Sequence, residues 1–310
     1  MRVVALGEPL VQLNAVTPGP LRYVTHFERH VAGSELNFCV SILMTGVDCS
    51  LLARVGRDEF GRSILEYARA RGVEVSSVKE DDAPTGVYFI QRHFPVPDRS
   101  EVFYYRRGSA GSRLSPEDVN EALIKGARLV HSTGITLAIS DSAREAVERA
   151  FQLASNRSVD TNIRPKLWAP DKAREALRRV IGGLEFLFVD PVDSKIIIGE
   201  SEPDAAVRKF TEEFSVQTVV FKMGERGARV YMDGKQVHGP TFRVRVEDPI
   251  GAGDALAGYF VGLVIQGKSV EEAIRYASAA ATLVLTTRGD TEALPTLAEA
   301  SKFLSSFEGT

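Results

Sequence analysis

The chain has 310 residues, of which 44% are hydrophobic and 25% are charged, and its formal net charge is −3. This composition is ordinary for a globular protein. The small negative charge excludes a global basic field of the kind that recruits nucleic acid or anionic membrane. No apolar run reaches the roughly 18 residues of a spanning helix, and the start of the chain resembles a strand rather than a signal peptide. We therefore expect a cytoplasmic protein with no nucleic-acid or membrane partner.

Short apolar runs alternate with helical patterns along most of the chain. The strand candidates are residues 2–6, 50–55, 128–132, 157–160, 185–189 and 218–222. The helix candidates are residues 35–45, 59–71, 141–155, 171–181, 202–213, 253–266, 270–285 and 296–306. This alternation predicts a single α/β domain over residues 1–310, with a mostly parallel central sheet covered by helices on both faces.

Two segments, 9–32 and 84–107, break this alternation because they are strand-like and carry no intervening helix. The second segment contains two β-rich runs joined by a turn with Pro95 and Pro97, which predicts a β-hairpin that projects from the main body. The two cysteines, Cys39 and Cys49, lie in apolar surroundings without metal-ligand spacing. We expect both to be buried, reduced and structural.

The run from Glu247 to Gly258 carries the strongest chemical signal. Gly251, Ala252 and Gly253 precede Asp254, and an apolar helical pattern follows. Such a turn directs unpaired backbone N–H groups to one point at a helix N-terminus, where they and the helix dipole attract an anion. Asp254 could take the proton of a hydroxyl that attacks a phosphate at this point. The alternative, which this turn alone leaves open, is that Asp254 is a helix N-cap.

Two motifs resemble the signatures of the ribokinase-like (PfkB) carbohydrate kinase family. The family's second signature is Asp, then Ser or Thr, any residue, and Gly-Ala-Gly-Asp. Residues 248–254 match it at every fixed position except Pro249. Its first signature is a glycine pair followed by a helix that carries Asn, matched here by residues 32–37 with Ala32 in place of one glycine. The resemblance implies a three-layer α/β/α sandwich, a small β-sheet lid formed by segments 9–32 and 84–107, and an ATP-dependent sugar kinase with Asp254 as the base.

The resemblance also indicates where the nucleotide would bind. A glycine turn, Lys222 to Gly227, follows the strand candidate 218–222, and the family places nucleotide phosphates and ribose at this position. Lys222 stands where many members have Thr, and the chain has no P-loop motif. The implied nucleotide-binding residues are Asn162, Arg164, Ser194, Lys222, Gly224, Gly227, Gly251, Ala252 and Gly253. For Ser194 a place in a surface loop is the favoured alternative.

Magnesium would accompany the ATP phosphates. The family often carries an Asn-x-x-Glu element that shapes the magnesium site. The corresponding region, Asp190 to Ser194, does not match that element. The sequence therefore assigns no protein ligand to the metal.

Two arginines indicate an acidic sugar as the substrate. Arg106 lies two residues from Tyr104, so both would share a strand face, and Arg164 follows a predicted strand at its carboxyl end, where α/β proteins bind ligands. A guanidinium can hold a carboxylate with paired hydrogen bonds. For each arginine the alternative is a solvated surface charge.

The chain is most similar to a branch of the family, the archaeal 2-keto-3-deoxygluconate kinases of a modified Entner–Doudoroff route. This resemblance rests on residues 31–37, 104–106, 162–168 and 288–290. It implies sugar contacts from Gly33, Asn37, Tyr88, Tyr104, Arg106, Ile135, Arg164, Asp254 and Asp290. For Tyr88 and Tyr104, cross-strand pairing in the hairpin is an alternative role.

We therefore expect ATP-dependent phosphorylation of the 6-hydroxyl of 2-keto-3-deoxy-D-gluconate. The sequence does not distinguish this substrate from its galactonate epimer. The alternatives are a ribokinase or fructokinase-like kinase of a neutral sugar, or a sugar sensor without catalysis. We also expect a homo-oligomer formed through the lid, because an isolated lid would expose sheet surface and edges.

Overall fold

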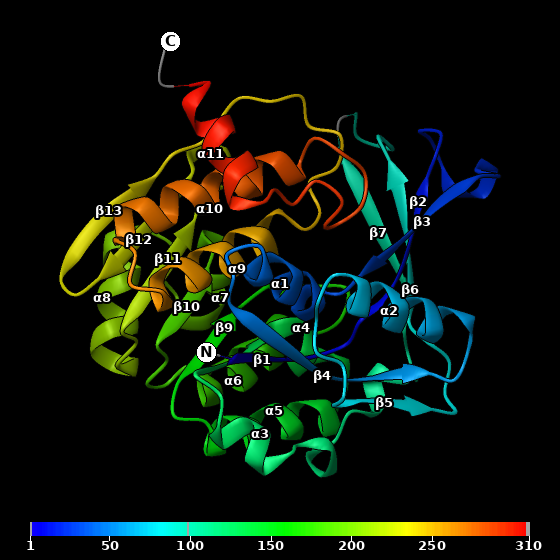
Figure 1. The fold of residues 1–310 in the computed structure, drawn as a ribbon, viewed down its shortest axis with the longest axis horizontal. Coiled ribbons are helices and arrows are strands. Elements are labelled where there is room, and N and C mark those ends of the chain that lie inside the picture. Colours follow the sequence, from blue (N-terminus) through cyan, green and yellow to red (C-terminus); the bar gives the residue numbers. More distant parts are fainter. Residues whose placement is uncertain (1, 98, 308–310) are drawn as a thin grey trace.

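A nine-stranded sheet forms the centre of the computed structural model, which describes residues 2–97 and 99–307 (Figure 1). From edge to edge its strands are β13 (Lys235–Gly239), β12 (Ala228–Met232), β11 (Thr218–Lys222), β10 (Phe186–Val189), β9 (Arg157–Asp160), β8 (Leu129–Thr133), β1 (Arg2–Leu6), β4 (Asp48–Gly56) and β5 (Val78–Asp81). The pairs β11–β12 and β12–β13 are antiparallel, and the other neighbours are parallel. The sheet confirms the predicted strands and the mostly parallel architecture.

The strands that the sequence did not predict lie at the edges of the sheet. β5 has only half-buried and exposed positions, β12 alternates between buried and half-buried positions, and β13 is mostly exposed. These strands lack the continuous apolar run that marks a strand buried on both faces. Edge position therefore explains why they were missed.

Helices cover both faces of the sheet. One face packs against α1 (Ser34–Leu43), α2 (Glu59–Ala70), α9 (Ala252–Ile265), α10 (Val270–Val284) and α11 (Leu297–Ser305). The other face packs against α3 (Glu121–Lys125), α4 (Gly134–Ile139), α5 (Asp141–Leu153), α6 (Pro170–Val180), α7 (Pro191–Ile198) and α8 (Pro203–Phe214). The strand β1 shows why both layers form, because Val3 and Ala5 join one core while Val4 and Leu6 join the other. The predicted helices are present, and the additional ones, α3, α4 and α7, have at most 8 residues.

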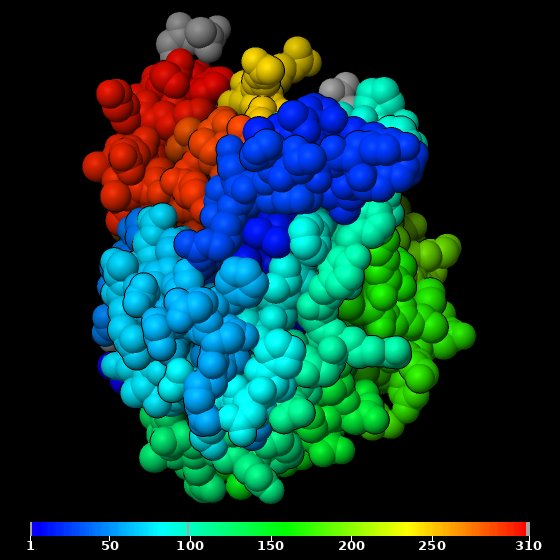
Figure 2. Space-filling model, turned by 90° about the vertical axis from the view of Figure 1, so that its right-hand side faces the viewer, coloured from blue at the N-terminus to red at the C-terminus, as the bar shows by residue number. Residues whose placement is uncertain are grey.

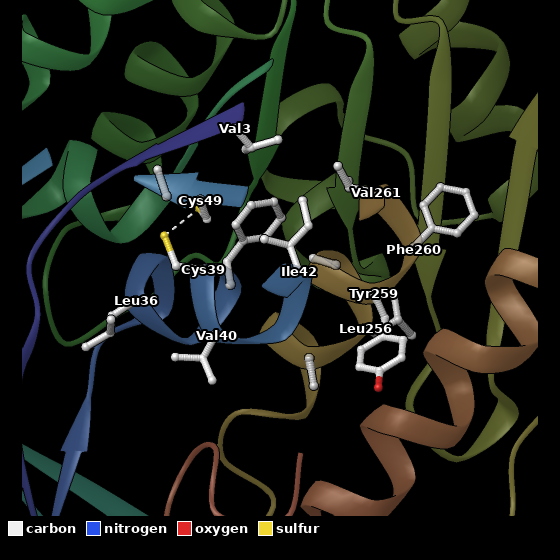
Figure 3. Packing of buried hydrophobic residues seen from close by; sticks show 14 of the residues in the cluster. Val3, Leu36, Cys39, Val40, Ile42, Cys49, Leu256, Tyr259, Phe260 and Val261 are labelled. Atoms are coloured by element: carbon white, nitrogen blue, oxygen red, sulfur yellow. Dashed lines mark hydrogen bonds between the residues drawn. The ribbon is translucent and has the colours of Figure 1, made fainter. Parts of the chain in front are cut away.

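Helix α9 lies in the centre of the first core, next to α1 (Figure 3). A Cβ atom on Gly258 would lie 2.5 Å from Ser41 Cβ, so glycine allows the two helices to approach closely. The same core contains Cys39 and Cys49, which are buried and free, with their Sγ atoms 2.7 Å apart. The expectation of buried, reduced cysteines is therefore confirmed.

A second sheet of four strands lies beside this sandwich, on the right of Figure 1. Its order is β3 (Phe27–Ala32), β2 (Leu10–Ala15), β6 (Val87–Arg92) and β7 (Ser100–Tyr105). The central pair β2–β6 is parallel, and the two outer pairs are antiparallel hairpins. Figure 2 shows these blue and cyan segments side by side on one face of the molecule. The segments predicted to form a lid thus form one separate sheet.

The inner face of the second sheet packs against the glycine turn before α9. Leu10, Ala32, Tyr88 and Ile90 form a small apolar cluster with Ile250 of that turn. This contact brings the second sheet over the predicted anion-binding site. That residues 1–310 form one cooperative domain stays a prediction. Within the described ranges, no helix is long and apolar enough to cross a membrane.

Candidate active site

A cavity of about 390 Å³ opens where three parts of the fold meet. These parts are the carboxyl ends of the parallel strands β1, β8, β9, β10 and β11, the N-terminus of α9, and the inner face of the second sheet. Ligands of α/β proteins bind at this edge of the sheet. The predicted site residues that line the cavity are Gly33, Asn37, Tyr88, Tyr104, Arg106, Ile135, Asn162, Arg164, Lys222, Gly251, Gly253, Asp254 and Asp290. Ser194, Gly224, Gly227 and Ala252 are not part of its lining.

The turn before α9 has the geometry of an anion site. Gly251 has a φ of +85°, and a Cβ atom there would overlap the backbone oxygen of Asp290, so only glycine fits. Helix α9 begins at Ala252 with Gly251 as its N-cap, and no side chain caps it. The amides of the first turn therefore remain available to an anion.

Asp254 is not the N-cap of α9. Its Oδ1 atom accepts a hydrogen bond from Ser34 Oγ at 2.5 Å, and its Oδ2 atom accepts one from Asn37 Nδ2 at 2.8 Å. Burial raises the pKa of Asp254 to about 6, against the lowering effect of these two hydrogen bonds. A carboxylate with a pKa just below neutrality, beside an anion site, suits a general base.

Asp290 is a second acid of the cavity and is buried, and Asn37 links it to Asp254. Asn37 Nδ2 donates to Asp290 Oδ2 at 2.8 Å, and Gln12 Nε2 and the Tyr88 hydroxyl donate to Asp290 Oδ1 at 2.5 and 3.2 Å. Burial raises the pKa of Asp290 to about 7. Tyr88 also pairs with Tyr104 across the hairpin, with ring centroids 6.1 Å apart. Tyr88 therefore contacts both the hairpin partner and the site.

The contacts of Arg106 differ from the paired hydrogen bonds to a substrate carboxylate that the sequence predicted. Its Nε atom donates to Glu8 Oε2 at 2.7 Å, and its Nη2 atom contacts the same oxygen. The fork that we expected to face a substrate is thus occupied by a glutamate of the protein. Arg164 lines the cavity but is largely exposed. The two arginines converge on one cavity, and one of them is already paired.

Lys222 and Asp160 form a second ion pair at the opposite wall. Lys222 Nζ lies 2.6 Å from both carboxylate oxygens of Asp160. Burial alone would lower the pKa of Lys222, but the attraction of Asp160 outweighs it and the pKa is raised. A Cβ atom on Gly253 would lie 3.7 Å from Lys222 Nζ. The ammonium group therefore lies next to the anion-binding turn.

Asp190 and Asp193 also line the cavity. Asp190 caps α7, and Asp193 accepts hydrogen bonds from Thr161 Oγ1 at 2.6 Å and from the Ile163 amide at 3.0 Å. Burial and then the nearby Asp190 raise the pKa of Asp193 to about 6. The two acids have the spacing of the family's Asn-x-x-Glu element, which the sequence argument dismissed because the residue types differ. Still, the described residues contain no cluster of three or more His, Cys, Asp or Glu suited to a metal.

The surface-loop interpretation of Ser194 is wrong. Ser194 lies in helix α7, is fully buried, and its Oγ atom donates to the backbone oxygen of Glu200 at 2.6 Å. Gly224 and Gly227 lie in the turn between β11 and β12, with φ of +58° and +81°. A Cβ atom on Gly224 would meet nothing within 4 Å, so this turn borders open space. Nucleotide binding by this turn stays a prediction.

Four polar residues of the site were missed because their roles depend on distant partners. Glu8 follows β1, and Gln12 lies on β2. Ser34 is the first residue of α1, and Asp160 is the last residue of β9. Gln12 meets Asp290 across 278 residues of sequence. Only the position of Asp160 at a strand's carboxyl end gave a local signal.

Fold and site together define a class of protein. The machinery of a small-molecule phosphotransferase is present in a mostly parallel α/β sheet, an amide-lined turn without a P-loop, the half-buried Asp254 carboxylate with a pKa of about 6, and an adjacent lysine. Comparison with known proteins makes this assignment specific. The model of the pfkB family of carbohydrate kinases matches residues 1–297, and the chain belongs to this family.

Three similar proteins place the chain within the family. It is 57% identical to the 2-dehydro-3-deoxygluconokinase of Thermoproteus tenax, over 97% of this chain and 94% of the relative. It is 29% identical to the 2-dehydro-3-deoxygalactonokinase of Haloferax volcanii, over 93% of this chain and 92% of the relative. A ribokinase II-type structure from E. coli, solved in complex with ATP and Mg²⁺, is 26% identical and superposes with a TM-score of 0.91. The match covers 98% of this chain and 99% of the E. coli chain. The ribokinase-like fold predicted from the sequence is confirmed.

Proposed function

We propose that the protein transfers a phosphoryl group from ATP to the 6-hydroxyl of 2-keto-3-deoxy-D-gluconate, also called 2-dehydro-3-deoxygluconate. The observation that carries this proposal is the half-buried Asp254 beside the amide-lined turn, in a cavity that also holds Arg106 and Arg164. The relative with 57% identity is named for the same substrate. The galactonate epimer is the closest additional substrate, since a relative is named for it.

In the proposed reaction Asp254 removes the proton of the 6-hydroxyl as that oxygen attacks the γ-phosphorus of ATP. The bond from the γ-phosphorus to the β–γ bridging oxygen breaks, and ADP leaves. Ser34 and Asn37 hold both oxygens of the carboxylate, so the base keeps one orientation. The amides at Gly251 to Gly253 receive the charge of the phosphoryl group, and the Lys222 ammonium lies beside them. Positioning and charge stabilisation of this kind account for most of the catalysis in phosphoryl transfer.

Magnesium supplies further charge neutralisation when it is bound to the ATP phosphates. Asp190 and Asp193 fit a role in holding it, because they are neighbouring carboxylates in the cavity wall, and burial together with the nearby Asp190 raises the pKa of Asp193. A bound cation would favour the ionised form of both acids. The nucleotide would extend from this wall along Asn162, Arg164 and the turn with Lys222, Gly224 and Gly227. Ser194 is left out because its hydroxyl is already bonded to the backbone.

At the other end of the cavity we assign the sugar acid to the second sheet. Arg106 and Arg164 would attract its carboxylate, while Tyr104 and Ile135 form the wall beside it. Asp290 would accept a hydrogen bond from a sugar hydroxyl, and Gly33 leaves room for the sugar backbone. At Gly33, with a φ of +128°, a Cβ atom would lie 2.7 Å from the Glu8 backbone oxygen.

A neutral-sugar kinase is the second candidate, and one observation favours it. Glu8 neutralises Arg106, and Arg164 is largely exposed, so the positive charge available to a carboxylate is smaller than two free arginines would give. A ribokinase or fructokinase-like enzyme needs no such charge.

A substrate panel separates the two candidates. ATP consumption is measured with 2-keto-3-deoxygluconate, its C4 epimer, ribose, fructose and gluconate, with Asp254→Asn as the inactive control. We expect the highest kcat/KM with 2-keto-3-deoxygluconate. A higher kcat/KM with ribose or fructose would contradict the proposal and support the second candidate.

We also propose that the protein works in the cytoplasm, where ATP is supplied, and that it is a homo-oligomer. The outer face of the second sheet supports the latter. Phe27, Phe89 and Tyr105 form a row of edge-to-face rings there, with centroids 5.3 and 5.4 Å apart, and Tyr105 is 69% exposed. An aromatic face of this kind is suited to burial against a second copy.

A further inference from the structure

Glu8 is a buried carboxylate in the wall of the cavity that the proposed chemistry does not use. It lies two residues beyond the end of β1 and is 2% exposed. Its Oε2 atom accepts the Nε and Nη2 hydrogen bonds of Arg106, and its Oε1 atom accepts a hydrogen bond from Ser109 Oγ. A buried acid requires such partners, since an unpaired buried charge is strongly unfavourable.

Two glycines from separate segments make room for this side chain. A Cβ atom on Gly86 would lie 2.5 Å from Glu8 Oε1, and one on Gly111 would overlap Glu8 Cγ. Neither glycine has a positive φ, so close approach to Glu8 rather than backbone freedom explains why no side chain is present. The chain thus forms a fitted compartment for one glutamate at the edge of the substrate cavity.

The Glu8–Arg106 pair joins the two sheets of the molecule. Glu8 follows β1 of the central sheet, whereas Arg106 follows β7 of the second sheet and also lies over the Tyr104 ring, 5.6 Å from its centroid. Both contacts to Glu8 use the Nε and Nη2 edge of the guanidinium, and neither uses Nη1. Because the guanidinium is planar and rigid, fixing one edge fixes the direction of the remaining nitrogen.

We propose that Glu8 is a positioning residue that determines specificity for the sugar acid. It holds Arg106 by the Nε–Nη2 edge and leaves Nη1 for the substrate carboxylate. This inference rests on the proposed function, and it replaces a two-pronged grip on the substrate by a single directed hydrogen bond. Glu8 also cancels part of the arginine's charge, so the carboxylate is selected by its position and not by a general attraction for anions.

The test compares two ligands that differ only at the carboxylate. These are 2-keto-3-deoxygluconate and 3-deoxyfructose, in which a hydroxymethyl group replaces the carboxylate. KM for the acid and the competitive inhibition constant of the neutral sugar are measured in wild type, Glu8→Ala, Arg106→Ala and the double variant. Ser109→Ala is the matched control, because it removes a hydrogen bond to Glu8 and leaves the pair with Arg106 intact.

Loss of a charge-assisted hydrogen bond should raise KM for the acid about 10- to 150-fold in both single variants. In both single variants the inhibition constant of 3-deoxyfructose should change little, and so should kcat for the acid. The double variant should lose no more preference for the acid than Arg106→Ala does. Ser109→Ala should keep the wild-type preference. Thermal unfolding of all variants shows whether each is folded. The double variant should have a higher Tm than the less stable single variant, because it leaves no buried charge unpaired.

Three results would overturn the inference. Glu8→Ala could keep the wild-type preference for the acid over 3-deoxyfructose, or it could bind the acid more tightly. In either case Glu8 only cancels charge. The variant could also weaken both ligands equally while folded, in which case Glu8 only supports the fold. If wild type does not phosphorylate 2-keto-3-deoxygluconate at all, the proposed function itself fails, and this result is separate from the other three.

Discussion

A single asparagine organises the acids of the active site. The one NH₂ group of Asn37 donates to Asp254 and to Asp290, both at 2.8 Å, while its Oδ1 atom has no partner among the described residues. Burial raises the pKa of Asp254 to about 6 and that of Asp290 to about 7, even though the hydrogen bonds from Asn37 lower both. Without these hydrogen bonds both acids would be protonated more readily near neutrality. Asn37 therefore favours the ionised form that a general base needs.

Replacing Asp254 by Asn should lower kcat by about 10²- to 10⁴-fold, because the base is lost while the shape is kept. ATP affinity and thermal stability should stay close to those of wild type. Single-turnover kinetics and nucleotide titration check this. A purified, folded variant that keeps more than about a tenth of the wild-type rate would place the base elsewhere.

The pH dependence of kcat/KM should show an acid limb near the pKa of Asp254, about 6. Asp254 acts only when ionised, so activity should rise as pH rises through this value. Asn37→Ala removes a hydrogen bond that stabilises the carboxylate, so the limb should move to higher pH. Ser34→Ala should shift it in the same direction without touching Asp290. A limb that stays in place, or moves to lower pH, would argue against Asp254 as the titrating base.

At the scale of elements, each strand of the second sheet has two different faces. The inner face contributes Tyr88 and Tyr104 to the cavity, and the outer face carries the aromatic row Phe27, Phe89 and Tyr105. The alternation of side chains along a strand makes this division unavoidable. Residues adjacent in sequence, such as Tyr104 and Tyr105, thus face the cavity and the outer surface respectively.

Light scattering should give a mass larger than one 33.9 kDa chain at micromolar concentration, because the aromatic row would be covered by a second copy. Tyr105→Glu places a charge on this row and should shift the mass towards one chain. Tyr23→Glu is the matched control, since Tyr23 is 74% exposed and lies outside the row. A wild-type protein that is monomeric under these conditions contradicts oligomerisation through the second sheet.

At the scale of the whole molecule, the cavity lies between the sandwich and the second sheet. Around the cavity the second sheet meets the sandwich through Ile250, through the Glu8–Arg106 pair and through the hydrogen bonds of Gln12 and Tyr88 to Asp290. Further polar contacts, among them Asn14 to Asp248 and Arg92 to Glu247, hold the sheet in place. In the proposed arrangement a sugar would add contacts to both sides, whereas a nucleotide at the wall with Lys222 would not reach the second sheet.

Hydrogen exchange should therefore slow in β6 and β7 when the sugar acid is added, and ATP alone should leave these strands largely unchanged. Amides of β11 and of the first turn of α9 should respond to the nucleotide instead, which serves as the internal control. Equal protection of β6 and β7 by ATP alone would show that the second sheet responds to the nucleotide.

The sequence predicted those parts of the molecule whose signals are local. The buried strands carry apolar runs, and the glycine turn at Gly251 carries its motif within a few residues, so both were found. Arg106 was placed in the cavity, but its partner Glu8 was not, because pairing across 98 residues follows from the packing of two sheets. Ser194 was misjudged for the same reason, since nothing near it in sequence indicates that helix α7 buries it.

The helix that follows the glycine turn is also deeply buried in the first core, where Leu256, Tyr259 and Phe260 are all buried. Anyone who redesigns this enzyme thus meets two regions with unequal freedom. Changes in α9 disturb the core and the reaction together, so few will be tolerated. If the proposed sugar site is correct, changes on the inner face of β6 and β7 should alter acceptor recognition and leave the two large cores intact. New acceptors should therefore be sought by varying positions such as Tyr104, with the glycine turn left unaltered.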